Sequence, residues 1–311
     1  MSTIPSTDVA DNTNEAEVPE DRFVDANGIT IAFNTFGDPA NPAVLLVMGL
    51  GTQMIAWSDQ MCRELADDGY FVVRYDNRDV GLSTHFDSPT PKLTDLIRGQ
   101  GNVYKLDDMA ADGMALLSEL GIRSAHVMGA SMGGFIAQTM AIAEPNRVDS
   151  LSLIMTSTGS RRVGRPTPRV MYRMARRPVT TTREEAMREA VLSYEIIGSP
   201  GITDLDGVAD LAGRAFDKAH DPAGTQRQLA AIMAQPDRTP ALKKLRMPTF
   251  VMHGLRDPLV AASGGLALAR SIPRARFVGL HGMGHDLPRT AAAEIRSELL
   301  GVIRRSEIAT A

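Results

Sequence analysis

The sequence is poor in cysteine and holds no long hydrophobic run. A single cysteine, Cys62, among 311 residues excludes an internal disulfide framework and a cluster of cysteine metal ligands. No stretch reaches the roughly 18 uninterrupted apolar residues that a membrane-spanning helix needs. The first residues, Met-Ser-Thr-Ile-Pro, lack the basic start and the apolar segment of a signal peptide, so we expect a cytoplasmic protein.

The chain also lacks an excess of positive charge. Its 33 Lys and Arg residues face 37 Asp and Glu residues, which gives a net charge of −4. Because nucleic-acid binding depends on clustered basic side chains that neutralise phosphates, this balance argues against a nucleic-acid partner. Residues 1–20 are rich in Ser, Thr, Asn, Asp and Glu, and we expect a disordered tail there. Residues 21–311 are long enough for one large α/β domain.

Short apolar runs alternate with longer helical patterns along most of this domain. Runs of strand length lie at 29–36, 44–48, 70–75, 126–129, 151–155, 249–253 and 276–280, with helical patterns at 57–68, 107–120, 131–144, 263–271 and 290–304. Such alternation is typical of β-α-β units. It predicts an α/β fold with a mostly parallel sheet and helices on both faces.

The alternation is interrupted between about residues 159 and 243. This stretch has helical patterns but no buried strand, and it is too long for a loop without structure. We therefore predict a helical cap, inserted after the strand at 151–155 and lying over the sheet.

The first part of the predicted cap is rich in arginine. Between Gly159 and Glu189, nine arginines face three glutamates, an excess of six positive charges, and Val170, Met171 and Met174 lie at helical spacing among them. One interpretation is a solvated lid helix whose apolar side faces the substrate pocket. The alternative is a surface that makes a weak contact with anionic lipid, as basic amphipathic helices do.

The most informative segment is Gly129-Ala130-Ser131-Met132-Gly133, which matches the pattern G-x-S-x-G. It follows a predicted buried strand and precedes a predicted helix, the context in which this pattern forms a nucleophile elbow. The small residues around Ser131 allow a tight turn that lifts its hydroxyl above the sheet. We predict that Ser131 is a catalytic nucleophile.

A serine hydroxyl needs a general base, and among six histidines His285 is the strongest candidate. On this architecture the base follows the last strand, and His285 lies in the flexible sequence Gly282-Met283-Gly284-His285 after the run at 276–280. His281 lies too early, at the strand end. We interpret His126 and His253 as structural, because each lies within or at the end of a strand, and His220 lies in the cap without a supporting pattern.

The base in turn needs a carboxylate that orients it, and Asp257 is the predicted acid. It follows the strand at 249–253 on a short loop and precedes Pro258. The other position for an acid on this architecture follows the strand at 151–155, where the sequence Thr156-Ser157-Thr158-Gly159 holds no carboxylate. A role as a simple turn residue is the alternative for Asp257.

Two backbone N–H groups should stabilise the oxyanion that forms during acyl transfer. We expect one from Met132, directly after the nucleophile, and the other from Leu50, in the glycine-rich loop Met48-Gly49-Leu50-Gly51. This chemistry requires no metal and no cofactor.

Together these motifs resemble those of the α/β-hydrolase fold, in particular esterases of the aclacinomycin methylesterase-like and small carboxylesterase branch. The resemblance also rests on Arg74–Ser83 and on His253-Gly254-Leu255-Arg256-Asp257-Pro258, and it covers the chain from about Arg22 onward, except for the cap. Met48 stands where many relatives have histidine, which leaves the backbone donor in place. We interpret the segment Asp76–Ser83 as structural.

The resemblance implies a serine hydrolase that cleaves a small-molecule carboxylic ester with Ser131, Asp257 and His285. Rival functions are a phospholipase or thioesterase at lipid surfaces, and a perhydrolase or C–C hydrolase that uses the same triad. A non-catalytic ligand receptor on a hydrolase scaffold is the alternative from another class. Dehalogenases are disfavoured, because they carry Asp at the position of Ser131.

Overall fold

The fold is built on one eight-stranded sheet. The computed structural model describes residues 19–90, 103–176 and 178–310. The strand order is β1-β2-β4-β3-β5-β6-β7-β8. The strands are β1 (Arg22–Ala26), β2 (Ile29–Phe36), β3 (Ala43–Val47), β4 (Phe71–Tyr75), β5 (Ala125–Ala130), β6 (Val148–Ile154), β7 (Thr249–Gly254) and β8 (Arg276–Leu280). Strands β3 to β8 pair in parallel, and β1 and β2 add an antiparallel edge, so the predicted mostly parallel sheet is confirmed.

Strand β1 was not predicted from the sequence. Its five residues, Arg-Phe-Val-Asp-Ala, pair with β2 at the edge of the sheet, and only Ala26 among them is buried. An edge strand that faces solvent needs no apolar run, so hydrophobic patterning gives no signal for it.

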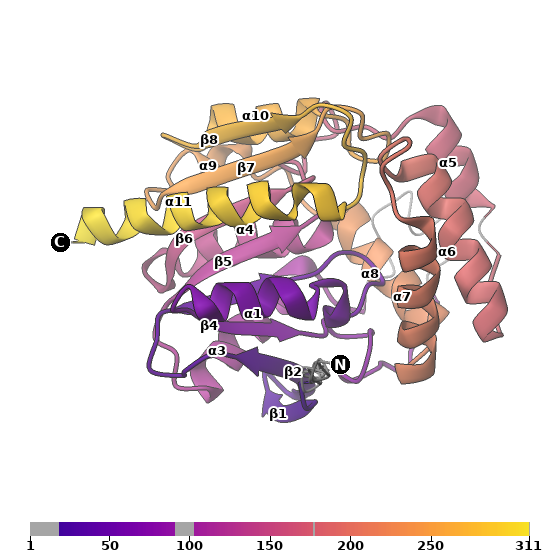
Figure 1. Ribbon diagram of the computed structural model, residues 1–311, viewed down its shortest axis with the longest axis horizontal. Helices are drawn as coiled ribbons and strands as arrows, with labels where there is room; N and C mark the ends of the chain where they lie inside the picture. Colours follow the sequence, from indigo (N-terminus) through magenta and orange to yellow (C-terminus); the bar gives the residue numbers. More distant parts are fainter. Residues whose placement is uncertain (1–18, 91–102, 177, 311) are drawn as a thin grey trace, which may run out of the picture.

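Helices cover both faces of the sheet (Figure 1). On one face lie α3 (Leu106–Glu119), α4 (Met132–Ala143) and α10 (Ser263–Ser271), and on the other α1 (Asp59–Asp67) and α11 (Ala292–Thr310). Successive strand residues point to opposite faces. Leu45 and Val47 therefore pack with the first group of helices, whereas Val44 and Leu46 pack with the second. This alternation explains why β3 is apolar throughout.

The segment between β6 and β7 is helical, as predicted, and all of its helices except the last one lie at one end of the sheet (Figure 1). It comprises α5 (Pro168–Ala175), α6 (Arg183–Ile197), α7 (Leu205–Lys218), α8 (Pro222–Ala234) and α9 (Thr239–Leu242). We call residues 160–238 the insertion, because α9 already packs against α4 and α10 of the central domain. Within the insertion, α6 and α7 pair closely with each other.

The apolar side chains of α5 do not share one buried face. Val170 is 1% exposed, but Met171 and Met174 are 58% and 41% exposed. Helix α5 is only eight residues long. Among the described helices and strands, its main packing partner is α6. Its other sides face solvent.

Buried hydrogen bonds hold most of the polar side chains of Asp76–Ser83, which agrees with a structural role. Asp76 accepts the backbone N–H groups of Met54 (2.7 Å) and Leu82 (3.0 Å). A Cβ atom at Gly81 would lie 2.0 Å from the Asp76 carboxylate, so glycine is needed there. The segment closes the carboxyl end of β4 beside the loop that follows β3.

The described residues include no helix that combines the length and the apolar character needed to cross a bilayer. The predicted disordered tail falls almost entirely on residues 1–18, which lie outside the described residues.

Candidate active site

Ser131 lies in the tight turn between β5 and α4. Its backbone has φ 55° and ψ −116°, a conformation that non-glycine residues rarely adopt. A Cβ atom at Gly129 would lie 2.2 Å from the Gly133 carbonyl oxygen, and one at Gly133 would lie 2.0 Å from that of Val47. The turn therefore requires glycine on both sides of Ser131, as the G-x-S-x-G pattern indicated.

The loops after β7 and β8 bring Asp257 and His285 to this turn. His285 Nε2 lies 3.0 Å from Ser131 Oγ, and His285 Nδ1 lies 2.7 Å from Asp257 Oδ2. Asp257 and His285 are buried, and Ser131 is partly buried. Ser131 and Asp257, which were predicted from separate motifs, are thus both within hydrogen-bond distance of His285, although His285 and Ser131 are 154 positions apart.

Asp257 accepts hydrogen bonds both from its own loop and from the imidazole of His285. Its Oδ1 accepts the backbone N–H groups of Leu259 (2.9 Å) and Val260 (2.8 Å), so it is also the turn residue that the alternative suggested. Burial alone would raise the pKa of Asp257. The adjacent His285, together with hydrogen bonds that include those from His253 and Val260, outweighs burial and lowers the pKa to about 2. Asp257 is therefore a carboxylate at neutral pH.

An ionised carboxylate can only accept hydrogen bonds, so His285 Nδ1 carries the proton that it donates to Asp257. In the neutral ring, Nε2 then presents a lone pair toward the hydroxyl of Ser131. This is the tautomer that can remove the hydroxyl proton.

The loop after β3 lies against Ser131. A Cβ atom at Gly49 would lie 3.3 Å from Ser131 Cβ, and Asn77 Nδ2 donates to the Met48 carbonyl oxygen over 3.1 Å. The backbone N–H groups of Leu50 and Met132 donate no hydrogen bond within the part of the chain that the structure describes, and Met132 is the first residue of α4. Both groups therefore remain available to an oxyanion.

Gln228 of α8, which the sequence did not single out, fixes the same loop. Its Oε1 accepts the N–H of Gly51 over 2.8 Å, and its Nε2 donates to the Arg78 carbonyl oxygen over 2.7 Å. Gln228 is fully buried. No motif surrounds it, because the two groups that it joins are 177 and 150 positions away in the sequence.

Among the remaining histidines, His253 also contacts the site. Its Nε2 donates to the Val260 carbonyl oxygen (2.7 Å) and lies 3.5 Å from Asp257 Oδ2, so it supports the loop of Asp257. His126 Nδ1 contacts Ser150 Oγ (3.0 Å) within the sheet, so both histidines are structural as interpreted. His281 is exposed, and His220 contacts the Thr180 carbonyl oxygen over 2.7 Å at the surface of the insertion.

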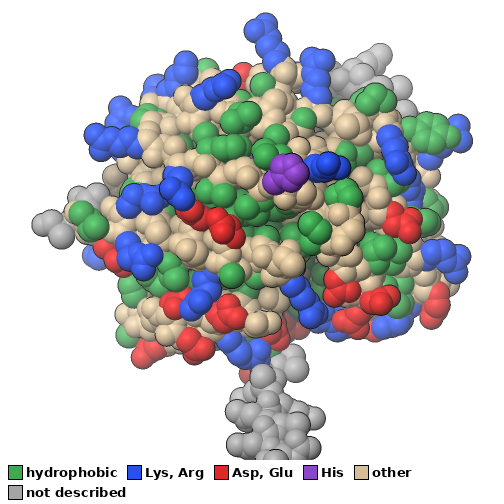
Figure 2. Space-filling model, turned by 45° about the horizontal axis from the view of Figure 1, so that its top comes forward, with side chains coloured by type: hydrophobic (Ala, Val, Ile, Leu, Met, Phe, Trp, Pro, Cys, Tyr) green, Lys and Arg blue, Asp and Glu red, His purple; other side chains and the backbone are tan. Residues whose placement is uncertain are grey.

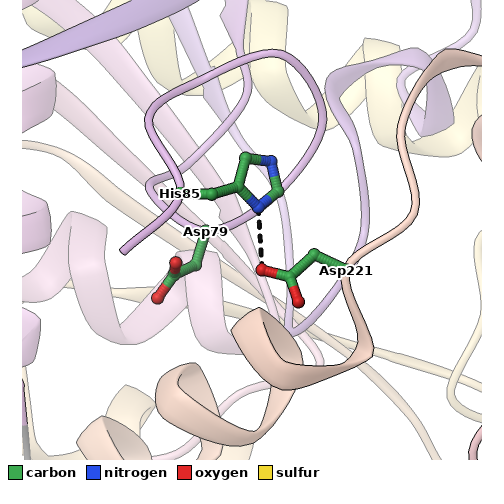
Figure 3. Close-up of side chains that lie close together, drawn as sticks. All are labelled: Asp79, His85 and Asp221. Atoms are coloured by element: carbon green, nitrogen blue, oxygen red, sulfur yellow. Dashed lines mark hydrogen bonds and ion pairs between the residues drawn. The ribbon is translucent and has the colours of Figure 1, made fainter. Parts of the chain in front are cut away.

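A second polar cluster joins the loop after β4 to the start of α8, and Figure 3 shows its Asp79, His85 and Asp221 side chains close together. These are potential metal ligands. However, Arg227 donates to both carboxylate oxygens of Asp79 (2.8 Å each) and to Asp221 (2.9 Å). The guanidinium already pairs with both carboxylates, so the cluster is explained as an ion-pair network that fastens the insertion to the central domain.

His85 in this cluster predicts a pH dependence of stability. Burial opposes its charge, but Nε2 meets the Gly81 carbonyl oxygen and Nδ1 meets Asp221 (2.9 Å each), and these acceptors raise its pKa. The charged ring therefore stabilises the fold below the ordinary pKa of about 6.5, and this contribution is lost as pH rises through the raised pKa. In urea titrations from pH 6 to 9, the free energy of unfolding should fall more for the wild type than for His85→Gln. Exposed His281→Gln is the control, and equal slopes for all three proteins would contradict the prediction.

The comparison with protein families settles the fold. Residues 42–288 match the family model described as alpha/beta hydrolase fold. The chain belongs to this family. The hydrolase resemblance seen in the sequence is thereby confirmed, and the matched range contains Ser131, Asp257 and His285.

Two curated relatives with different activities are similar in sequence to most of this chain. It is 28% identical over 290 residues to rhodomycin D methylesterase of Streptomyces peucetius, covering 86% of this chain and 92% of the relative. It is 26% identical over 249 residues to 3-oxoadipate enol-lactonase 2 of Acinetobacter baylyi, covering 79% of this chain and 83% of the relative. The methylesterase agrees with the predicted branch.

Solved structures share the fold at lower sequence identity. An enol-lactonase from Burkholderia xenovorans has a TM-score of 0.71 at 20% identity, over 91% of this chain and all of that chain. A bacterial membrane phospholipase A has a TM-score of 0.68 at 23% identity, over 91% of this chain and 86% of that chain. At these identities the likeness concerns the fold alone.

Proposed function

We propose that the protein is a serine hydrolase that cleaves carboxylic esters of small molecules through an acyl-enzyme. The observation that carries the proposal is the position of His285, whose two ring nitrogens lie 3.0 Å from Ser131 Oγ and 2.7 Å from Asp257 Oδ2. In this proposal Ser131 is the nucleophile, His285 the general base and then acid, and Asp257 the residue that orients the imidazole.

The first half of the reaction forms the acyl-enzyme. His285 Nε2 takes the proton of Ser131 as Oγ attacks the ester carbonyl carbon, and the negative charge moves to the carbonyl oxygen. The N–H groups of Leu50 and Met132 stabilise this oxyanion. The imidazolium then gives its proton to the alcohol oxygen, and the C–O bond breaks. In the second half, water attacks the acyl group with His285 again as base, which releases the acid and restores Ser131.

The relatives support an ester as the substrate. The names methylesterase and enol-lactonase both describe cleavage of a carboxylic C–O bond, the step derived above. A perhydrolase or a C–C hydrolase would use the same three residues on a different substrate. We therefore propose ester hydrolysis as the function of this chain.

Covalent labelling tests the proposal. The wild-type protein should turn over p-nitrophenyl acetate repeatedly, and a serine-directed fluorophosphonate should stop turnover with one adduct, which mass spectrometry locates on Ser131. An acyl-chain-length series then defines the preferred ester. If the phosphonate labels Ser131 but the unlabelled protein gives only a single burst of product, without further turnover, the ligand receptor would be supported instead.

A second observation supports contact with anionic lipid at α5. Arg161, Arg162, Arg165, Arg169 and Arg176 are exposed and form no ion pair within the described residues. The exposed apolar side chains beside them are Met171, Tyr172, Met174 and Val179. Figure 2 shows basic and hydrophobic side chains together at the right of the molecule, where Figure 1 places α5. Unpaired arginines beside exposed apolar groups are the features of an interfacial helix.

Liposome sedimentation tests this contact. We expect the protein to sediment with vesicles that contain phosphatidylglycerol, and less so as salt rises, because salt screens the attraction. Arg169→Ser combined with Met171→Ser should weaken sedimentation. Arg214→Ser, which removes an exposed arginine of α7 that is paired with Asp210 over 2.9 Å, is the control. Binding that does not depend on lipid charge would reject the contact.

A further inference from the structure

The loop that carries His285 is held by the insertion as well as by the central domain. Gly282 has φ +87° and Gly284 lies two residues on, so the backbone here has unusual freedom. The Arg256 N–H fixes the Met283 carbonyl oxygen over 3.0 Å from the neighbouring loop. The next groups along the loop contact the segment between α6 and α7.

Backbone contacts between the two segments are very close. The His285 N–H donates to the Ile197 carbonyl oxygen over 2.6 Å. A Cβ atom at Gly284 would lie 2.2 Å from the Gly198 carbonyl oxygen, so no other residue fits there without movement of the backbone. The segment between α6 and α7 therefore sets where the His285 backbone lies.

Two hydroxyl groups complete the contact through the residue that follows His285. Ser199 Oγ accepts the Gly284 N–H (2.9 Å) and donates to Asp286 Oδ1. Thr203 Oγ1 accepts the Ser199 N–H (2.7 Å) and lies 2.6 Å from Asp286 Oδ2, to which it donates. Each hydroxyl thus accepts a backbone N–H and donates to one carboxylate oxygen.

Asp286 depends on these hydroxyls. It is 5% exposed and has no ion pair within the described part of the chain, so the two hydroxyl donors satisfy its buried charge. Hydrogen bonds to a charged group are stronger than those between neutral groups, and removal of one donor leaves a buried acceptor unsatisfied. The loss of either hydroxyl should therefore loosen the loop on both sides of His285.

We propose that Ser199, Thr203 and Asp286 form a histidine clamp, a set of positioning residues through which the insertion holds His285 at its distance from Ser131. The clamp rests on the proposed function, since it acts through the general base. Small displacements of a catalytic group cost large factors in rate. In this proposal the insertion takes part in positioning the general base.

Thr203 offers a matched pair of variants. Thr203→Val keeps the shape and removes the hydroxyl, whereas Thr203→Ser keeps the hydroxyl. With p-nitrophenyl acetate, kcat should fall about 10- to 100-fold in Thr203→Val and in Ser199→Ala, with KM within about twofold of the wild type. Thr203→Ser should retain most of the wild-type kcat. Ser271→Ala is the control, because it removes a buried hydroxyl that donates to the Ala267 carbonyl oxygen in α10, away from the site.

A second readout does not require turnover. The imidazole proton that His285 shares with Asp257 should give a low-field ¹H NMR resonance, assigned by its loss in His285→Ala. We expect this resonance to broaden by faster exchange in Thr203→Val and Ser199→Ala, and to persist in Thr203→Ser and Ser271→Ala. If Ser199→Ala does not fold, the Thr203 pair decides.

The two readouts separate the clamp from the proposed function. Absence of ester turnover in the wild type would reject the hydrolase proposal, and the resonance would still test the clamp. An unchanged resonance and an unchanged kcat in Thr203→Val would overturn the clamp while the hydrolase proposal stands. Equal loss of kcat in Thr203→Ser and Thr203→Val would also overturn it, because the hydroxyl would then not be the cause.

Discussion

Ser131→Ala is expected to lower kcat for p-nitrophenyl acetate by at least about four orders of magnitude while the protein remains folded. The substitution removes Oγ, the atom that attacks the ester carbonyl carbon in the proposed mechanism. Ser131 Oγ makes a single side-chain hydrogen bond, to His285, among the described residues, so its loss should cost little stability. Alanine meets the same backbone strain at φ 55° as serine does.

The measurement combines kinetics with thermal unfolding. Ser152→Ala is the matched control, since Ser152 is a fully buried serine of the adjacent strand β6 whose hydroxyl has no hydrogen-bond partner among the described residues. The control should retain wild-type turnover. If Ser131→Ala hydrolysed the ester as fast as Ser152→Ala does, the assignment of the nucleophile would be wrong.

Asp257→Asn should lower kcat by about four orders of magnitude, with little change in the fold. The amide oxygen can take the place of Oδ1 and keep the turn bonds to Leu259 and Val260. The amide nitrogen would then face His285 Nδ1, where the wild-type carboxylate accepts a hydrogen bond over 2.7 Å. The ring would be forced into the tautomer with its proton on Nε2, which cannot take the proton of Ser131.

The pH dependence gives a second check on this prediction. Because the pKa of Asp257 is lowered to about 2, the wild type should keep its carboxylate across pH 5–9, and the deficit of Asp257→Asn should persist throughout that range. Asp237→Asn is the control, because Asp237 is an exposed turn residue whose Oδ1 accepts the Thr239 N–H over 2.9 Å. A deficit in Asp257→Asn no larger than in this control would reject the orienting role.

The sequence predicted the strands and helices of the central domain well where hydrophobic patterns and turn residues in the local sequence determine them. The seven predicted strands lie within a few residues of the observed ones, and the helix pattern at 263–271 coincides with α10. The helix predicted at 57–68 begins at Asp59 in the structure, two residues later than predicted. The reason is that the Ser58 side chain caps the helix by accepting the Met61 N–H.

The sequence by itself determined that Ser131, Asp257 and His285 lie on turns and loops after strand ends, since glycines and turn residues around each of them restrict where each side chain can lie. It did not reveal Gln228, the Arg227–Asp79 pair or the clamp at Asp286. These contacts join residues that are 83 to 177 positions apart, and none needs a motif in its own neighbourhood. Only the tertiary structure decides these contacts. A hydrogen bond between distant segments depends on how the insertion packs against the sheet, and such a contact leaves no periodic pattern in the sequence around either residue.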